Sequence, residues 1–294
     1  MPIAFVEIDG SSLTLDAVAA VAEHRANVRL SEAARMRMLA SNRVVMDIVA
    51  RNAVVYGVTT GFGKLSDIAI PPDKLAALQV NLVRSHAAAV GPLLPKHEVR
   101  AMMLLRANVI AKGFSGARPE VPALLCEMLN ADLWPPVAEQ GSVGASGDLA
   151  PLATLACALI GEGMLHHRDR VGPAAAMLAG AGLTPLTLGP KEGITLINGT
   201  QAHTAVAALA VRDARGAPRG RPRRASARTR VARRNHRRHG CAHPLRARGA
   251  RAARHGQPAP RARDDRARKL RRRGRSHART SRAAGDRTRH GERR

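Results

Sequence analysis

Cysteine is scarce in this 294-residue chain, and long apolar runs are missing. Cys126, Cys157 and Cys241 show no paired or CxxC spacing, which excludes a disulfide framework and favours a reducing, cytoplasmic setting. The opening residues lack the basic start and apolar stretch of a signal peptide, and no segment has the uninterrupted apolar length of a membrane helix. No HExxH or comparable metal-ligand spacing occurs. We therefore expect a soluble, cytoplasmic protein with no metal site and no membrane partner.

Large apolar residues become rare after Val211. The branched aliphatic residues there are Val231, Leu245 and Leu270, aromatic residues are absent, and arginine, alanine, glycine and proline dominate. The residues before 212 are electrically balanced, so the whole formal charge of +26 lies in residues 212–294. Such a composition cannot offset the entropy of ordering the chain. We expect two parts, a folded domain over 1–211 and a disordered, basic tail over 212–294.

The change at residue 212 is abrupt. Residues 201–211 follow the pattern of a buried helix, and Arg212 abandons that pattern without a turn or a cap signal. Displaced codons in a gene rich in G and C tend to encode arginine, alanine, glycine and proline. We interpret residues 212–294 as the product of a reading-frame shift, a hypothesis that sequencing the gene would test.

The first 211 residues contain mainly helical patterns joined by glycine-rich loops, so the predicted fold class is mainly α. Leu75, Leu78, Leu82 and His86 share one predicted helix face, and a second face carries Val99, Met102, Arg106 and Val109. Extended pieces are expected near 3–8 and 186–188. The predicted helices cover 15–24, 31–52 with a Ser31 cap, 73–89, 96–111, 119–129, 149–160 and 201–211.

The run Gly144-Ala145-Ser146-Gly147-Asp148 carries the most specific chemistry. The Gly147 nitrogen could attack the Ala145 carbonyl, and loss of two waters would convert Ser146 into an exocyclic alkene. Gly147 has no Cβ to obstruct the closure, and the helix expected from Leu149 would direct its positive end at the ring. The plain alternative is a glycine-rich loop capped by Asp148. Three residues alone do not decide between the two.

The residues around the run favour the electrophile. GSVGASGDLAPLA resembles the signature of the aromatic amino acid lyases, and three further segments match this family in the same order. The resemblance covers about residues 1–211 and, within the family, is strongest to the histidine ammonia-lyases. The other segments are VVYGVTTGFGKL at 54–65, NLVRSHAAAVGPLLP at 81–95 and KEGITLINGTQA at 191–202.

The resemblance implies the N-terminal part of the helical ammonia-lyase fold, which is similar to that of fumarase and aspartase. It implies the electrophile MIO (4-methylidene-imidazol-5-one), formed from Ala145, Ser146 and Gly147, with no external cofactor. It also implies elimination of ammonia from L-histidine to give trans-urocanate, the first step of histidine degradation. Phenylalanine or tyrosine stays open as the substrate, since related enzymes differ mainly in a few side-chain contacts.

The family implies roles for four further residues. Tyr56 would remove the β-proton, although a solitary tyrosine is more often packed in a core. His86 would contact the substrate side chain, although a plain satisfied histidine is the commoner outcome on an apolar helix face. Asn198 would lie by the MIO and the substrate amine, and Gln201 would also bind substrate. The alternative for Asn198 is a cap of the helix that begins near Thr200.

Phe62, Asp148 and Leu152 are expected to support the site. The glycine-rich segment at 56–64 is no Walker loop, because Val58 stands where its first glycine belongs. Ser146 does not fit a hydrolase elbow, because Asp148 stands where Gly-x-Ser-x-Gly needs glycine.

Family members draw further catalytic groups from a following half and assemble as homotetramers. No residue after 211 matches those groups, so we expect this polypeptide to be incomplete and inactive by itself. The competing class is a nucleic-acid binder that uses the tail. Such binding would be strongly salt-dependent and sequence-blind, because the tail has no aromatic residues for stacking and no recognisable fold motif. We expect no specific nucleic-acid partner.

Overall fold

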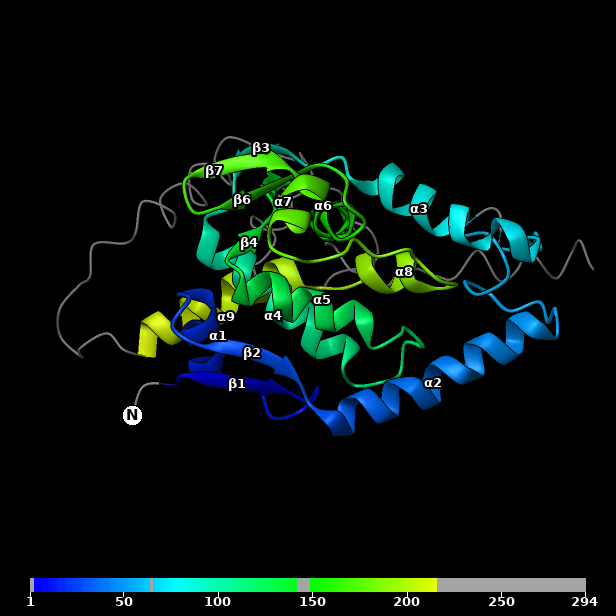
Figure 1. The fold of residues 1–294 in the computed structure, drawn as a ribbon, viewed down its shortest axis with the longest axis horizontal. Helices are drawn as coiled ribbons and strands as arrows, with labels where there is room; N and C mark the ends of the chain where they lie inside the picture. Colours follow the sequence, from blue (N-terminus) through cyan, green and yellow to red (C-terminus); the bar gives the residue numbers. More distant parts are fainter. Residues whose placement is uncertain (1–2, 64–65, 142–148, 216–294) are drawn as a thin grey trace, which may run out of the picture. The chain divides into compact units, whose positions relative to one another are not determined.

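The computed structural model describes residues 3–63, 66–141 and 149–215 (Figure 1). Helices dominate this part of the chain, which confirms the mainly α prediction. None of the helices in these ranges is both long and apolar enough to cross a membrane. The helices are α1 (Leu15–Ala22), α2 (Glu32–Ala50), the short 3-10 helix η2 (Pro72–Lys74), α3 (Leu75–His86), α4 (Lys96–Ile110), α5 (Glu120–Asn130), α6 (Leu149–Leu159), α7 (Ala174–Gly180), α8 (Glu192–Ile197) and α9 (Gln201–Arg215).

Short strands form three small sheets around the helices. The first pairs β1 (Phe5–Ile8) with β2 (Asn27–Leu30) in parallel, with Val6 opposite Val28. The second pairs β3 (Val90–Leu93) with β5 (Ala138–Gln140), and the third has the order β4 (Leu133–Trp134), β6 (Met164–His167) and β7 (Arg170–Pro173). Pairs in the last two sheets are antiparallel.

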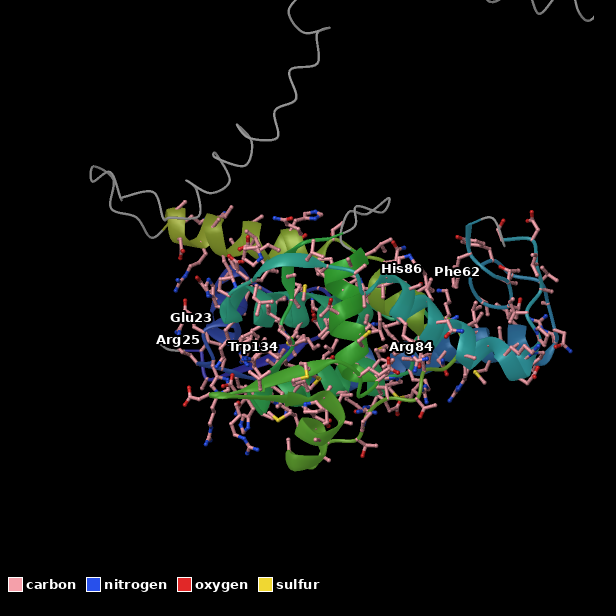
Figure 2. All side chains as sticks on the ribbon, turned by 90° about the horizontal axis from the view of Figure 1, so that it is seen from above. Glu23, Arg25, Phe62, Arg84, His86 and Trp134 are labelled. Carbon is pink, nitrogen blue, oxygen red and sulfur yellow. The ribbon has the colours of Figure 1, made fainter. Side chains whose placement is uncertain are left out.

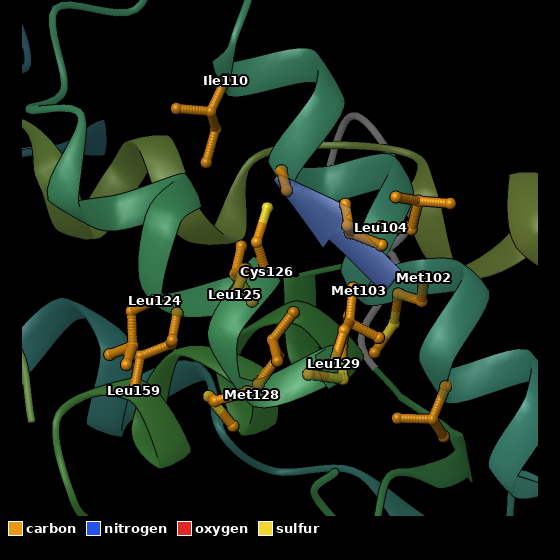
Figure 3. Packing of buried hydrophobic residues seen from close by; sticks show 14 of the residues in the cluster. Met102, Met103, Leu104, Ile110, Leu124, Leu125, Cys126, Met128, Leu129 and Leu159 are labelled. Carbon is orange, nitrogen blue, oxygen red and sulfur yellow. The ribbon is translucent and has the colours of Figure 1, made fainter. Parts of the chain in front are cut away.

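The core lies between α4 and α5 and continues into α6. Both helices bury long runs of aliphatic and methionine side chains (Figure 3). Met102, Met103 and Leu104 are fully buried on α4, and Leu125 and Met128 are fully buried on α5. Helix α1, α9 and strand β2 also pack on this pair. The folded part therefore has one continuous hydrophobic core, which fixes α4 as a central element.

Local signals fixed several helix starts. The Ser31 hydroxyl accepts a hydrogen bond from the Ala34 amide at 3.1 Å, which confirms the predicted cap of α2. Thr14 caps α1 in the same way through the Ala17 amide, at 3.2 Å. Predicted and observed bounds differ by a few residues, chiefly at frayed helix ends.

Several sequence expectations were wrong. Residues 186–188 form no strand in the structure, and α9 continues past Arg212 to Arg215. Helix α9 buries Gln201, Ala202 and Ala205, whereas much of its remaining surface is exposed, so it is not the buried helix that its pattern predicted. Val109 is 40% exposed despite its predicted place on the buried face of α4. On α3 the predicted apolar face carried Leu75, Leu78, Leu82 and His86. The fully buried positions are instead Leu75, Gln79 and Val83.

Candidate active site

Tyr56 stands in a turn that follows α2. Its side chain is 63% exposed, so the packed-core alternative does not hold in this chain. The Tyr56 ring meets the Phe62 ring edge-on, with centroids 6.2 Å apart and an interplanar angle of 80°. Gly57 adopts a φ of 72°, a conformation that glycine reaches without steric cost. The turn thus presents the phenol outward, with Phe62 as its neighbour.

Two buried threonines hold this turn. The Thr59 hydroxyl donates to the Ala53 carbonyl and accepts from the Val55 amide at 2.9 Å. The Thr60 hydroxyl accepts from the Gly57 amide at 3.2 Å. Since hydroxyls replace the missing backbone partners on both sides of Tyr56, its position is fixed although the segment is rich in glycine.

His86 ends helix α3 and is half-buried. Its Nδ1 lies 2.8 Å from the Leu82 carbonyl oxygen. Because a carbonyl only accepts, Nδ1 must carry the proton in this contact, and Nε2 of the neutral ring is then an acceptor. The Ser85 hydroxyl donates to the same carbonyl at 2.9 Å and lies 3.1 Å from Nδ1. In Figure 2, His86 and Phe62 lie toward the same end of the body, away from Trp134.

Ala145, Ser146, Gly147 and Asp148 lie outside the described residues, but both flanks of their segment are described. A Cβ added to Gly141 would lie 2.9 Å from Pro151 Cδ and 3.0 Å from Ala150 Cβ. The residue before the segment therefore meets the first turn of α6. Leu152, expected to support the site, is fully buried in that helix.

Asn198 is the C-cap of α8, and its backbone N–H donates to the Ile194 carbonyl at 3.0 Å. The backbone of Asn198 thus closes α8, whereas the predicted role as a cap of the next helix stays a prediction. Gln201, the first residue of α9, is buried, and its Oε1 accepts from Arg106 Nη1 at 2.7 Å. Arg106 Nη1 also donates to the Asn198 carbonyl at 3.1 Å, and Nη2 donates to the Thr195 carbonyl.

The elements that carry these residues pack on one another. Helix α3, which ends in His86, lies against α6 and α8, and α6 lies against α8 (Figure 1). Gln79 of α3 accepts from the Ile194 amide at 3.2 Å and thereby ties α3 to α8. The fold therefore brings the helix after the Ala145–Gly147 triad, the His86 helix and the Asn198 turn into one neighbourhood. Tyr56 lies in the turn after α2, with an exposed side chain whose ring contacts Phe62, and is not carried by these three helices.

Sequence reasoning missed the role of Arg106. It lies on the apolar face of α4 between buried residues, and a guanidinium in such a place needs acceptors nearby. A charged residue on an apolar helix face was the signal that the sequence offered. The acceptors of Arg106 could not be predicted from it, because they belong to residues 195–201, far along the chain. Burial lowers the pKa of Arg106 to about 10, so the group remains cationic at neutral pH.

Comparisons with known proteins identify the family of this fold. The family model described as aromatic amino acid lyase matches residues 13–221. A histidine ammonia-lyase of Treponema denticola is 48% identical over 209 residues, which are 71% of this chain and 41% of the relative. One from Koribacter versatilis is 50% identical over 209 residues, covering 71% of this chain and 40% of the relative.

Solved structures give the same picture. A histidine ammonia-lyase from Trypanosoma cruzi superimposes with a TM-score of 0.67 at 41% identity, over 72% of this chain and 41% of that one. A tyrosine aminomutase from Streptomyces globisporus gives a TM-score of 0.67 at 41% identity, over 73% of this chain and 40% of that one. These matches confirm the ammonia-lyase fold. The chain spans about 40% of the length of the relatives it matches, and it belongs to the aromatic amino acid lyase family.

Proposed function

We propose that this chain carries the electrophile-forming part of an ammonia-lyase that converts L-histidine into trans-urocanate and ammonia. The observation that carries the proposal is the identity of 48% to 50% with histidine ammonia-lyases over about seven-tenths of the chain. The matched region contains Tyr56, His86, the Ala145–Gly147 triad, Asn198 and Gln201. The family thus supports carbon–nitrogen lyase chemistry, and the more similar sequences favour histidine.

The described flanks of the triad suit the proposed electrophile. Gly141 lies against Ala150 and Pro151, so the described residues on the two sides of the triad are close to each other. Ring closure needs a short, constrained loop whose neighbouring groups approach each other. When formed from Ala145, Ser146 and Gly147, MIO would supply an electron-poor alkene that makes the amine a better leaving group.

The side chains of this chain would do the rest. The Tyr56 oxygen would take the β-proton of the substrate while the electrons of that C–H bond form the alkene and those of the C–N bond leave with ammonia. His86 Nε2, an acceptor in the tautomer set by Leu82, would receive a hydrogen bond from the N–H of the substrate imidazole. Asn198 and Gln201 would line the amine side, with Phe62 and Leu152 in supporting positions.

A chimera tests the proposal. Residues 1–211 would be joined to the remaining part of the Treponema denticola histidine ammonia-lyase at the aligned position. We expect the peptide spanning 141–151 to be lighter by two waters, and urocanate to appear from L-histidine. Mass spectrometry and urocanate absorbance report these results.

The matched control is Ser146→Ala in the same chimera. We expect no loss of water and a fall in turnover of about a thousandfold or more, because the alkene cannot form. Turnover that survives this change would refute the proposed chemistry. Release of cinnamate from L-phenylalanine in place of urocanate would favour the phenylalanine or tyrosine alternative.

The proposal extends to setting and assembly. Burial raises the pKa of the Cys126 thiol to about 12 and also raises the pKa of Cys157, so both are protonated and unreactive, as suits a reducing cytoplasm. For the complete enzyme we propose the homotetramer of the family, whereas this chain by itself is not expected to form it. The exposed side chains of Met36, Val44 and Met46 on α2 support an assembly in which that helix is covered.

A further inference from the structure

We propose that Arg106 is the positioning residue of this site and that it holds the turn of Asn198 to Gln201 in its working geometry. This inference rests on the proposed function for its catalytic meaning. The claim that Arg106 holds this turn depends only on the contacts of Arg106.

The guanidinium of Arg106 is enclosed by the turn. One nitrogen, Nη1, donates to the Asn198 carbonyl at 3.1 Å and to Gln201 Oε1 at 2.7 Å. The other, Nη2, donates to the Thr195 carbonyl in the last turn of α8. Two of these three acceptors are peptide carbonyls, so the planar fork fixes the peptide planes that follow Thr195 and Asn198. Arg106 therefore sets the direction in which the chain leaves Asn198.

Gly199 shows how closely the parts fit. A Cβ at this position would overlap both Gln201 Oε1 and Arg106 Nη1. The turn thus needs glycine because the guanidinium occupies the space beside it. Gln201 is then also a support for Arg106, because its Oε1 accepts from Arg106 Nη1.

Arg106 also differs from a structural arginine on the same helix. Arg100 is fully buried and donates to the Val21 and Leu129 carbonyls, but it pairs with the Asp132 carboxylate at 3.2 Å. Within the described ranges, no carboxylate pairs with Arg106. The acceptors of Arg106 in these ranges are carbonyl and amide oxygens, so its role there is to hold the turn.

Arg100 provides the matched control for the test. Three variants of the full chain would be compared with the unaltered chain: Arg106→Met, Arg106→Lys and Arg100→Met. Amide hydrogen exchange measured by mass spectrometry would follow residues 198–204 beside Arg106, and residues 129–132 beside Arg100. The ultraviolet band of the ring would be recorded on the same samples.

We expect Arg106→Met to accelerate amide exchange over residues 198–204 by about tenfold or more, because the hydrogen bonds that it removes are made to that turn. Exchange over residues 129–132 should change little, because Arg106 does not contact them. Arg100→Met should give the reverse. Arg106→Lys keeps the charge and one or two donors, so it should recover most of the protection. It also serves if the methionine variant does not fold. The ultraviolet band should shift in Arg106→Met and stay unchanged in Arg100→Met.

Exchange over 198–204 that stays unchanged in both Arg106 variants would overturn the proposal. So would equal loosening of that turn by Arg100→Met, because a general loss of stability would then explain the effect. A band that is present in the unaltered chain and identical in Arg106→Met would also overturn it. If the unaltered chain shows neither a band nor the loss of two waters, the electrophile does not form without the remaining part of the enzyme, and the exchange comparison alone judges Arg106.

Discussion

At the scale of the residue, the lack of space beside Gly199 limits which side chains can replace this glycine. We expect Gly199→Ala to destabilise the fold by about 2 kcal/mol, since the added methyl overlaps the Arg106 and Gln201 side chains and forces them apart. Chemical denaturation followed by circular dichroism would measure the change in the free energy of unfolding.

Gly180→Ala is the matched control for that substitution. Gly180 ends helix α7, and a Cβ there would meet no atom within 4 Å. Alanine is the better helix former, so this variant should be neutral or slightly more stable. Equal effects of the two substitutions would show that the overlap at Gly199 relaxes without cost.

The sequence identified most candidate residues by type but not their surroundings. Tyr56, His86 and Asn198 were found because their motifs are local. The hydrogen bond that sets the His86 tautomer is also local, between residues four apart, but it exists only after α3 has formed. The contacts of Arg106 with Asn198 and Gln201 join residues more than ninety positions apart, and no periodicity encodes them.

At the scale of the element, an ion pair connects α3 to the turn after α6. Arg84 Nε and Nη2 donate to the Glu162 carboxylate, with Nε 2.9 Å from Oε2. Hydrogen bonding to Arg84 holds the pKa of Glu162 below its ordinary range. A depressed carboxylate pKa stabilises the fold above the unfolded-state pKa, and this stabilisation is lost as the pH falls through the folded-state pKa.

We expect Arg84→Gln to return the pKa of Glu162 toward its ordinary range, as followed by the carboxyl carbon signal in an NMR titration. Asp9 is an internal control. The pKa of Asp9 is lowered by hydrogen bonds from the Ser12 and Ser11 amides, so it should not respond. An unchanged Glu162 pKa, or a parallel change at Asp9, would argue against the ion pair as the cause.

Helix periodicity predicted the long elements well and the short ones poorly. Helices α4, α5 and α6 carry their own apolar spacing, and Ser31 marks the start of α2. Strands of two to four residues such as β4 and β5 have no such period, and they exist because a distant partner supplies the hydrogen bonds. Helix α9 has a buried-type pattern, yet within the described chain its outer face remains without a covering element.

At the scale of the whole molecule, the charge is concentrated beyond residue 211. We expect the full chain to retard DNA of any sequence at low salt and to release it steeply as salt rises, because counterion release drives such binding. Electrophoretic mobility shifts measure this. A chain ending at residue 221, where the family match ends, should not bind. Binding that persists at high salt, or that distinguishes sequences, would contradict the expected sequence-blind attraction.

The sequence by itself determined the helical class, the family and the three residues of the expected electrophile, because these depend on local patterns and on one contiguous motif. The tertiary structure alone decided which groups surround them. It buried Arg106 under the Asn198 turn, left Tyr56 exposed and packed α3, α6 and α8 together. These outcomes arise from hydrogen bonds and close packing between segments far apart in the chain, and such contacts exist only once the core of α4 and α5 has formed.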